Sequence, residues 1–293
     1  MSHPSSAPAQ TRKLLFEALG VSVVEFACSA QVEGEGPEEP NPNHSIVLVR
    51  RGVFRRARGR ERVLADPNHV LFFNAAEPYR YAHPVPGGDL CTVLAIETGH
   101  ALELVARHAP LDAEDPRAPF RRGHALSDSR IAALHYELLC RLRKPQGRLP
   151  LEDLLAELAD QAVRAAYRGD DPRVGRECVS AAVRRRRRDL AETAMLAINA
   201  RLHSPPNLTQ LAGLCGCSPF HLSRTFRETV GISLRRYSRR LRVLVAADRL
   251  AGGAPDLTRL GLELGYADHS HFTNTFRREW GRPPSQFRAW LGG

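Results

Sequence analysis

The sequence predicts an α+β protein with an N-terminal β-barrel that carries a helical pair, followed by an all-α C-terminal part. Three observations support this prediction. Short runs rich in Val, Ile and Phe occupy the first hundred residues, apolar residues at helical spacing replace them from about residue 126, and the last hundred residues contain an internal repeat. At 293 residues the chain is long enough for two domains of ordinary size.

The N-terminal half alternates strand-like runs with turn signals. Five runs are expected to be strands: residues 21–26, 46–51, 63–64, 70–73 and 91–96. Residues 33–43 (EGEGPEEPNPN) have the composition of a loop, and residues 51–52 and 86–89 that of turns. The first 20 residues are expected to form a loose arm. Short strands at this spacing are typical of a small barrel or sandwich.

Apolar residues at helical spacing predict a helical pair within residues 126–168, interrupted by Pro145 and Gly147. Each helix has an apolar stripe, formed by Ile131, Leu134 and Leu138 in the first and by Leu151, Leu155 and Leu158 in the second. These stripes can pack on the barrel of the same chain or form the seam of a homodimer, and the sequence favours neither. Residues 169–172 are expected to be a hinge, which ends an N-terminal domain of residues 1–170.

The excess positive charge lies in the C-terminal part. Residues 171–293 contain 21 Arg, no Lys and 10 acidic residues, a net charge of +11, whereas residues 1–170 have a net charge of −1. This distribution indicates a polyanionic partner for the C-terminal part, with a solvated basic surface as the alternative. Five consecutive arginines, residues 184–188, close an expected linker over residues 171–188. They lead into an amphipathic helix over residues 190–202, from which they can also contact phosphates.

The six cysteines form neither CxxC pairs nor a dense disulfide framework. Cys215 and Cys217 are the one close pair, and small buried apolar residues are favoured over metal or redox chemistry. The polar, Pro/Ser-rich start is unlike a signal peptide, and no apolar run approaches the ~20 residues of a membrane span. The sequence therefore predicts a soluble, cytoplasmic protein without a membrane contact.

The C-terminal part contains two copies of one pattern. Four residues recur after 49 positions (Leu208, Thr209, Leu211 and Gly216 as Leu257, Thr258, Leu260 and Gly265), and five recur after 50 (His221, Thr225, Phe226, Arg227 and Gly231 as His271, Thr275, Phe276, Arg277 and Gly281). The one-residue slip falls in a turn, where insertions are tolerated. Each copy is a helix, a turn with Gly and a second helix, which is the helix-turn-helix arrangement. Residues 189–293 are therefore expected to form an all-α domain with two such motifs.

The second helix of each copy has a core face and an exposed face. The core faces are expected to hold Leu222, Phe226 and Val230 in the first copy and Phe272, Phe276 and Trp280 in the second. The exposed faces hold Phe220, Ser223, Arg224 and Arg227 in the first copy and Ser270, Asn274, Arg277 and Arg278 in the second. Arg binds guanine and Asn binds adenine through paired hydrogen bonds in the major groove, so these side chains suit base reading. An ion pair of Arg224 with Glu228, at i+4, is the alternative role.

One helix over residues 233–250 is expected to join the two copies. Its 18 or so residues span about 27 Å. That length can hold two recognition helices near the ~34 Å separation of successive major-groove segments on one DNA face. The sequence thus predicts two DNA-reading helices on one chain.

The motifs LGYADHSHFTNTFRREWGRPPSQFR (residues 264–288) and CSPFHLSRTFRETVGISLRRYSRRLR (residues 217–242) resemble the two helix-turn-helix motifs of AraC/XylS-type transcriptional regulators. The resemblance covers about residues 184–291. It implies base-facing positions at Phe220, Ser223 and Arg224 and at His269, Ser270, His271 and Asn274. Asn274 stands where many relatives carry Arg. The implied partners are double-stranded DNA, RNA polymerase, a small-molecule effector and a second copy of the chain, with no cofactor.

The N-terminal part resembles, more weakly, the cupin-like effector or dimerisation domains of that family, through His44, Gly52, Asp66, Pro78 and His83. The spacing of His44 and His83 is unlike the HxH pair of cupin metal sites, so a metal there is not expected. The sequence predicts a sequence-specific transcriptional regulator, with activator as the expected mode, rather than an enzyme. A cupin-type metalloenzyme fused to a DNA-binding domain is the alternative. A DNA-repair alkyltransferase is a second rival, with Cys28 as its isolated cysteine.

Overall fold

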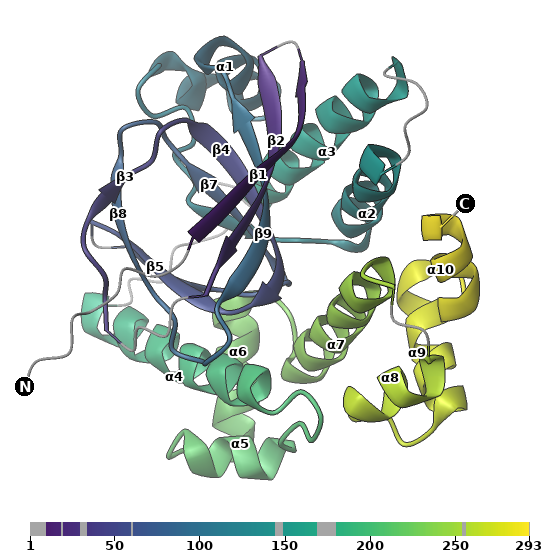
Figure 1. Cartoon of the computed structure of the whole chain (residues 1–293). Coiled ribbons are helices and arrows are strands. Elements are labelled where there is room, and N and C mark those ends of the chain that lie inside the picture. Colours follow the sequence, from purple (N-terminus) through teal and green to yellow (C-terminus); the bar gives the residue numbers. More distant parts are fainter. Residues whose placement is uncertain are drawn as a thin grey trace, which may run out of the picture. The chain divides into compact units, whose positions relative to one another are not determined.

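The computed structural model describes residues 10–18, 20–29, 34–59, 61–143, 149–168, 180–253 and 256–292. The chain divides into two compact units, Met1–Arg168 and Gly169–Gly293 (Figure 1). The predicted helix break at Pro145 and Gly147 and the predicted hinge at residues 169–172 lie outside the described residues. None of the described helices combines the length and the apolar character that a membrane crossing requires.

The first unit contains two antiparallel sheets. The larger has the order β1 (Gln10–Ala18), β2 (Val21–Cys28), β9 (Asp89–Ile96), β4 (His44–Gly52), β7 (His69–Phe73) and β10 (His124–Leu126). The smaller has the order β3 (Glu39–Pro40), β8 (Pro78–Ala82), β5 (Phe54–Arg58) and β6 (Glu61–Ala65). Each sheet keeps two edge strands, so the described strands are not closed into the barrel that the sequence predicted.

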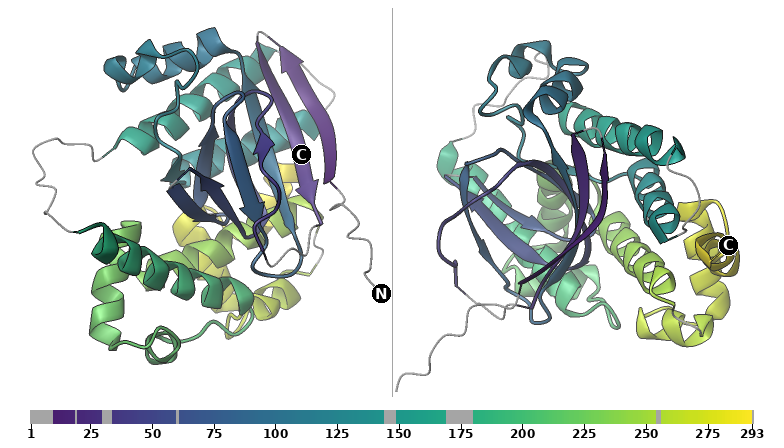
Figure 2. Two further views of the ribbon diagram at one scale, coloured as in Figure 1. Left: turned by 90° about the vertical axis from the view of Figure 1, so that its left-hand side faces the viewer. Right: turned by 45° about the horizontal axis from the view of Figure 1, so that its top comes forward.

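Side chains on the two faces of the larger sheet enter different cores, because successive residues of a strand point in opposite directions. Ile46 and Leu48 of β4 lie in a core shared with helices, whereas Val47 and Val49 lie in a core that includes Phe54 of the smaller sheet. In Figure 2 the blue and teal helices cover one face of the larger sheet. These helices are α1 (Thr98–Ala106), α2 (Ser129–Arg143) and α3 (Leu149–Tyr167), with a short 3-10 turn at Pro110–Glu114.

The five predicted strands are confirmed, and the prediction of a loose N-terminal arm is wrong for Gln10–Ala18. That segment pairs along its length with β2 as an exposed edge strand. Its burial is low, so its strand character comes from tertiary pairing rather than from an apolar pattern. Strands β5 and β8 were not predicted either.

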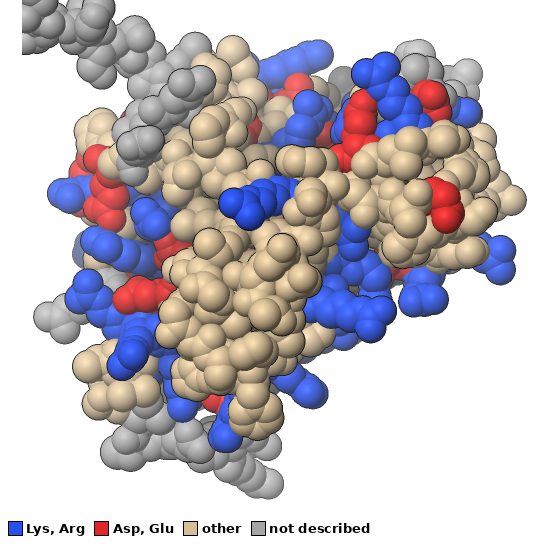
Figure 3. Space-filling model, turned by 90° about the horizontal axis from the view of Figure 1, so that it is seen from below, with Lys and Arg blue, Asp and Glu red and all other residues tan. Residues whose placement is uncertain are grey.

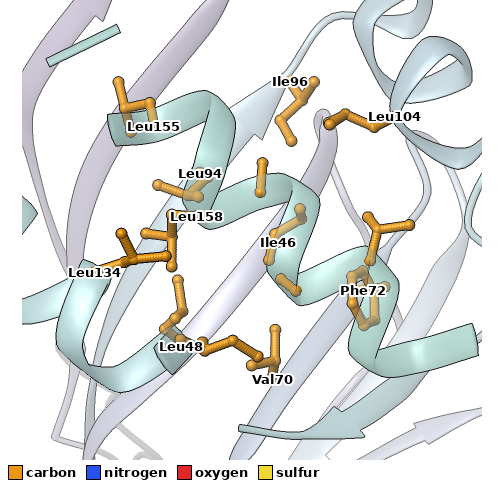
Figure 4. Close-up of a cluster of buried hydrophobic side chains, with 14 of the residues drawn as sticks. Ile46, Leu48, Val70, Phe72, Leu94, Ile96, Leu104, Leu134, Leu155 and Leu158 are labelled. Carbon is orange, nitrogen blue, oxygen red and sulfur yellow. The ribbon is translucent and has the colours of Figure 1, made fainter. Parts of the chain in front are cut away.

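The predicted helical pair is confirmed as α2 and α3, and both apolar stripes face the core of their own unit. Figure 4 shows Leu134, Leu155 and Leu158 against Ile46 and Leu94 of the sheet. Each of these side chains is buried. The stripes are therefore used within the chain and give no reason to expect a dimer.

The second unit is all-α. Its helices are α4 (Ala181–Ala200), α5 (Leu208–Leu214), α6 (Pro219–Val230), α7 (Leu234–Ala251), α8 (Leu257–Glu263), α9 (His269–Trp280) and α10 (Pro284–Gly292). Helix α4 begins nine residues before the predicted start of residue 190. Ser180 caps it by accepting a hydrogen bond from the Val183 N–H at 3.3 Å, so the arginine run of residues 184–188 is helical rather than part of a linker.

Candidate functional site

Helices α6 and α9 begin and end in the same way. The Ser218 hydroxyl accepts a hydrogen bond from the His221 N–H at 3.2 Å, and the Asp268 carboxylate accepts one from the His271 N–H at 2.7 Å. Each helix ends at a glycine in the left-handed conformation, Gly231 with φ 87° and its counterpart 50 residues later with φ 69°. The repeat in the sequence therefore specifies two helices of the same length.

The two helices are also buried in the same way. Over residues 221–230 and 271–280 the order of exposed, half-buried and buried positions is identical. Phe226 and Phe276 are fully buried, and replacing either with Ala is expected to cost about 3–5 kcal/mol of stability. Thr225 and Thr275 are buried as well, although the sequence placed neither in the core.

Helix α7 holds the two copies together. It contacts α6 on one side and α9 and α10 on the other. The Phe226 ring lies 5.4 Å from the ring of Tyr237 of α7, and in the second copy the Phe276 ring lies 5.2 Å from that of Phe287 of α10. The observed 18 residues confirm the predicted connecting helix, which spans about 27 Å.

Close backbone packing fixes the first helix of the second copy against α9. A Cβ atom added at Gly261 of α8 would lie 3.0 Å from the Phe272 Cβ, so only a residue without a side chain fits there unchanged. In the following turn, Gly265 has φ +74° and a Cβ there would lie 2.6 Å from the His203 carbonyl oxygen. The turn therefore fixes where α9 begins.

The first exposed face comprises the residues that the sequence predicted. Phe220 is 78% exposed, Arg224 and Arg227 are exposed, and Ser223 is half-buried. These four side chains and Glu228 line one hollow on the surface of α6. The hollow therefore combines one exposed aromatic ring with two guanidinium groups and one carboxylate.

Arg224 forms the ion pair that the sequence offered as its alternative role. Its Nε donates to Glu228 Oε1 at 2.8 Å, and this hydrogen bond holds the pKa of the Glu228 carboxyl below its usual range. Arg187, within the arginine run of α4, lies 3.3 Å from the other Glu228 oxygen. The arginine run is thus next to the exposed face of α6.

The second exposed face lies on α9. Its exposed side chains are His269, Ser270, His271, Asn274, Arg277 and Arg278. His269 lies 3.4 Å from the Thr258 hydroxyl of α8 and 3.3 Å from the Thr273 hydroxyl, and the His271 ring packs edge-on against Tyr266 at 5.3 Å. The two histidines are therefore oriented by the turn and by α8. Figure 3 views the side on which α5 and α8 lie in Figure 1, and Lys and Arg are more frequent there than Asp and Glu.

The first unit contains a cavity of about 160 Å³ between its two sheets. Aromatic side chains form much of its wall: Phe26, Phe54, Phe73, Tyr79 and Tyr81. Cys28, His83, Asp89 and Cys91 also line it and are buried. Burial and the neighbouring Asp89 charge raise the pKa of the Cys91 thiol well above its usual value.

Sequence reasoning missed this cavity cluster, although it had named Cys28 and His83 separately. The other histidine considered with His83 is elsewhere: His44 Nδ1 accepts from the Ala75 N–H at 3.1 Å, and burial lowers the pKa of His44. Of this cluster, only Cys91 stood at the end of an expected strand, residues 91–96, so nothing in the sequence connected it with Cys28, His83 or Asp89.

The family model and the curated relatives agree with the helix-turn-helix geometry. A family model described as a helix-turn-helix domain matches residues 211–289. Regulatory protein SoxS of Salmonella typhimurium is 31% identical over 99 residues, which are 34% of this chain and 92% of SoxS. The HTH-type transcriptional activator RhaR of Klebsiella pneumoniae is 30% identical over 166 residues, which are 57% of this chain and 55% of RhaR. A solved transcriptional regulator with an AraC-type DNA-binding domain, from Chromobacterium violaceum, matches 36% of this chain and 93% of its own with a TM-score of 0.34 and 24% identity.

Proposed function

This chain belongs to the AraC/XylS family of DNA-binding transcriptional regulators, and from that premise we propose that α6 and α9 each read base edges in the major groove of one operator. In the first copy the proposed base-contacting residues are Phe220, Ser223 and Arg224, and Arg227 lies next to them on the same exposed face. In the second they are His269, Ser270, His271 and Asn274, with Arg277 and Arg278 toward the end of the helix.

The observation that carries this proposal is that the two helices share one pattern of buried positions while their exposed faces differ in part. Two copies of one helix-turn-helix fold need the same positions buried. Residues 221–230 and 271–280 have the same order of buried, half-buried and exposed positions. The exposed positions are free of that requirement. Over residues 221–230 four positions are exposed; two carry the same residue in both copies, and two differ: Arg224 corresponds to Asn274, and Glu228 to Arg278. Two helices that read different bases need this combination.

Phosphate contacts are the proposed role of the arginines around the reading helices. The exposed arginine run on α4 lies beside α6, because Arg187 reaches Glu228. A net charge of +11 over residues 171–293 supplies the sequence-independent part of DNA affinity. Each neutralised phosphate releases counterions, so affinity is expected to fall steeply with salt.

For the first unit we propose effector binding in the cavity between the sheets. Its aromatic wall and few buried polar groups are features of small-molecule sites. Activation through RNA polymerase and a homodimeric state are further parts of the proposal, and they rest on the family rather than on a described surface. We propose no catalytic activity for the chain.

The decisive experiment maps the DNA bound by the full chain across a genome and then measures affinity for the recovered sites at several salt concentrations. The expected result is a shared motif with two half-sites about one helical turn apart, bound more tightly than scrambled DNA. Recovered sites without a common motif, bound no better than scrambled DNA, would refute base reading.

A further inference from the structure

Three ligand-bearing side chains meet on the wall of the cavity in the first unit. Cys28, His83 and Asp89 are each buried, and each offers an atom to a group whose members all lie within 4.8 Å of one another. Thiolate sulfur, imidazole nitrogen and carboxylate oxygen are the donor types that zinc takes in proteins. The three residues are 55 and 6 positions apart in the sequence, so only the fold brings them together.

The strand register builds this cluster. Cys28 stands directly opposite Asp89 in the β2–β9 ladder, and Asp89 is also paired with Gly52 of β4. His83 follows β8, in the other sheet, so the cluster joins the two layers. Backbone contacts leave little freedom at this place, because a Cβ atom at Gly88 would lie 1.8 Å from the Cys28 carbonyl oxygen. A rigid ligand set of this kind is preorganised for an ion.

His83 and Cys91 both contact the Asp89 carboxylate. His83 Nε2 lies 2.5 Å from Asp89 Oδ1, and the Cys91 Sγ donates to Asp89 Oδ2 at 3.2 Å. The second ring nitrogen, His83 Nδ1, is buried without a hydrogen-bond partner among the described residues. An ion bound between His83 and Asp89 would take Nε2 and replace this hydrogen bond, whereas Nδ1, on the other side of the ring, lies outside the ligand set.

We propose that Cys28, His83 and Asp89 bind one thiophilic divalent cation of the zinc class, with Cys91 supporting Asp89 from outside the ligand set. One thiolate and one carboxylate neutralise the two charges of the ion, which a buried site requires. The three side chains line the cavity, so the fourth position of a tetrahedral ion opens to it. A small molecule with an anionic or thiol donor is the class of ligand that this position takes. The inference does not depend on DNA binding.

The test uses the purified full chain, stripped with a chelator and titrated with Co²⁺ and Zn²⁺. We expect one Co²⁺ per chain, with a near-ultraviolet thiolate-to-metal charge-transfer band that Zn²⁺ abolishes by displacement. Cys28→Ala should lose the band, and Cys91→Ala should keep it with an affinity lowered about 10- to 100-fold. The matched control is Cys140→Ala, which removes another buried cysteine of the same unit, on α2, and should leave the titration unchanged.

Two results overturn the proposal. One is a Co²⁺ titration of the wild-type chain that does not saturate or that shows no charge-transfer band. In that case the cluster is a hydrogen-bond network and not a metal site. The other is a band that persists in Cys28→Ala, which assigns the metal to different cysteines. If Cys28→Ala fails to fold, X-ray absorption of the zinc-loaded wild-type chain decides: one sulfur in a shell of nitrogen and oxygen is expected, and a shell with none or with two contradicts the assignment.

Discussion

Replacing Arg224 with Ala tests whether the exposed face of α6 reads a base. The guanidinium is on the same hollow as Phe220 and Ser223, and its Nε binds Glu228, which holds the side chain along the helix axis. A bidentate Arg–guanine contact is worth about 1–3 kcal/mol, so the Arg224→Ala chain should bind its operator about 5- to 150-fold more weakly. It should also lose preference at one base pair of the first half-site.

Glu228→Gln is the matched control, because it breaks the same ion pair and leaves the arginine in place. If Arg224 reads a base, Glu228→Gln keeps the base preference, and the loss of a negative charge near DNA raises affinity for all sequences. Binding selections on a randomised operator, run on both variants and the double variant, measure this. If Arg224→Ala keeps the base preference of the unmodified chain, Arg224 does not read a base. If Arg224→Ala and Glu228→Gln change affinity and base preference in the same way, the role of Arg224 is the ion pair with Glu228.

Three further predictions concern phosphate contacts, DNA binding by the C-terminal fragment on its own, and the dependence of stability on pH. Arg278→Ala should weaken binding to all sequences about equally and lower the slope of log affinity against log salt by about one unit, as titrations on operator and scrambled DNA will show. The fragment of residues 184–293 should bind operator DNA with a steep salt dependence, and a folded fragment without such binding would contradict the assignment of both readers to it. Burial, and then the charge of Arg50, lower the pKa of His135 in the folded chain to about 3 from 6.5. Because the unfolded chain takes up the proton first, stability is lost as pH falls below 6.5, by about 2 kcal/mol between pH 7 and pH 5. His135→Gln should remove that part of the dependence in thermal denaturation at the two pH values.

The sequence predicted those strands that contain a short apolar run. Strand β7 is buried throughout and strand β4 is buried except for its last two residues, and their apolar runs were visible. Strand β5 has the sequence FRRAR, which no hydrophobic pattern identifies. Its Arg56 is 1% exposed, donates to the Phe72 carbonyl oxygen at 2.7 Å and lies 4.9 Å from the centre of the Phe73 ring. Tertiary contacts of this kind cannot be read from a single segment.

The two candidate sites, the exposed helix faces and the cavity cluster, also differ in how far the sequence predicted them. The exposed faces of α6 and α9 follow from helical periodicity, since each face is contained in twelve consecutive residues. The cavity cluster depends on which strands are neighbours and in which register, because Cys28 meets Asp89 only when β2 pairs with β9. Periodicity carries no information about that pairing. The arginine run was misassigned to a linker for a related reason, as its helix is started by Ser180 and not by an apolar stripe.

Comparing the two copies position by position suggests how they divide recognition. The first copy has Arg224 followed four residues later by Glu228, and the second has Asn274 followed by Arg278. In the first, the carboxylate holds a guanidinium in place before DNA arrives, which lowers the entropy lost on contact with a guanine. It also brings a negative charge close to the phosphates, and Arg187 of α4 offsets that charge. In the second copy, the neutral amide of Asn274 is suited to adenine, and Arg278 is a cation four residues later. No carboxylate at that position holds the reading side chain in place, so more of the affinity is expected to come from phosphate contacts. We therefore expect base discrimination to be sharper in the half-site of α6 and salt dependence to be steeper in that of α9.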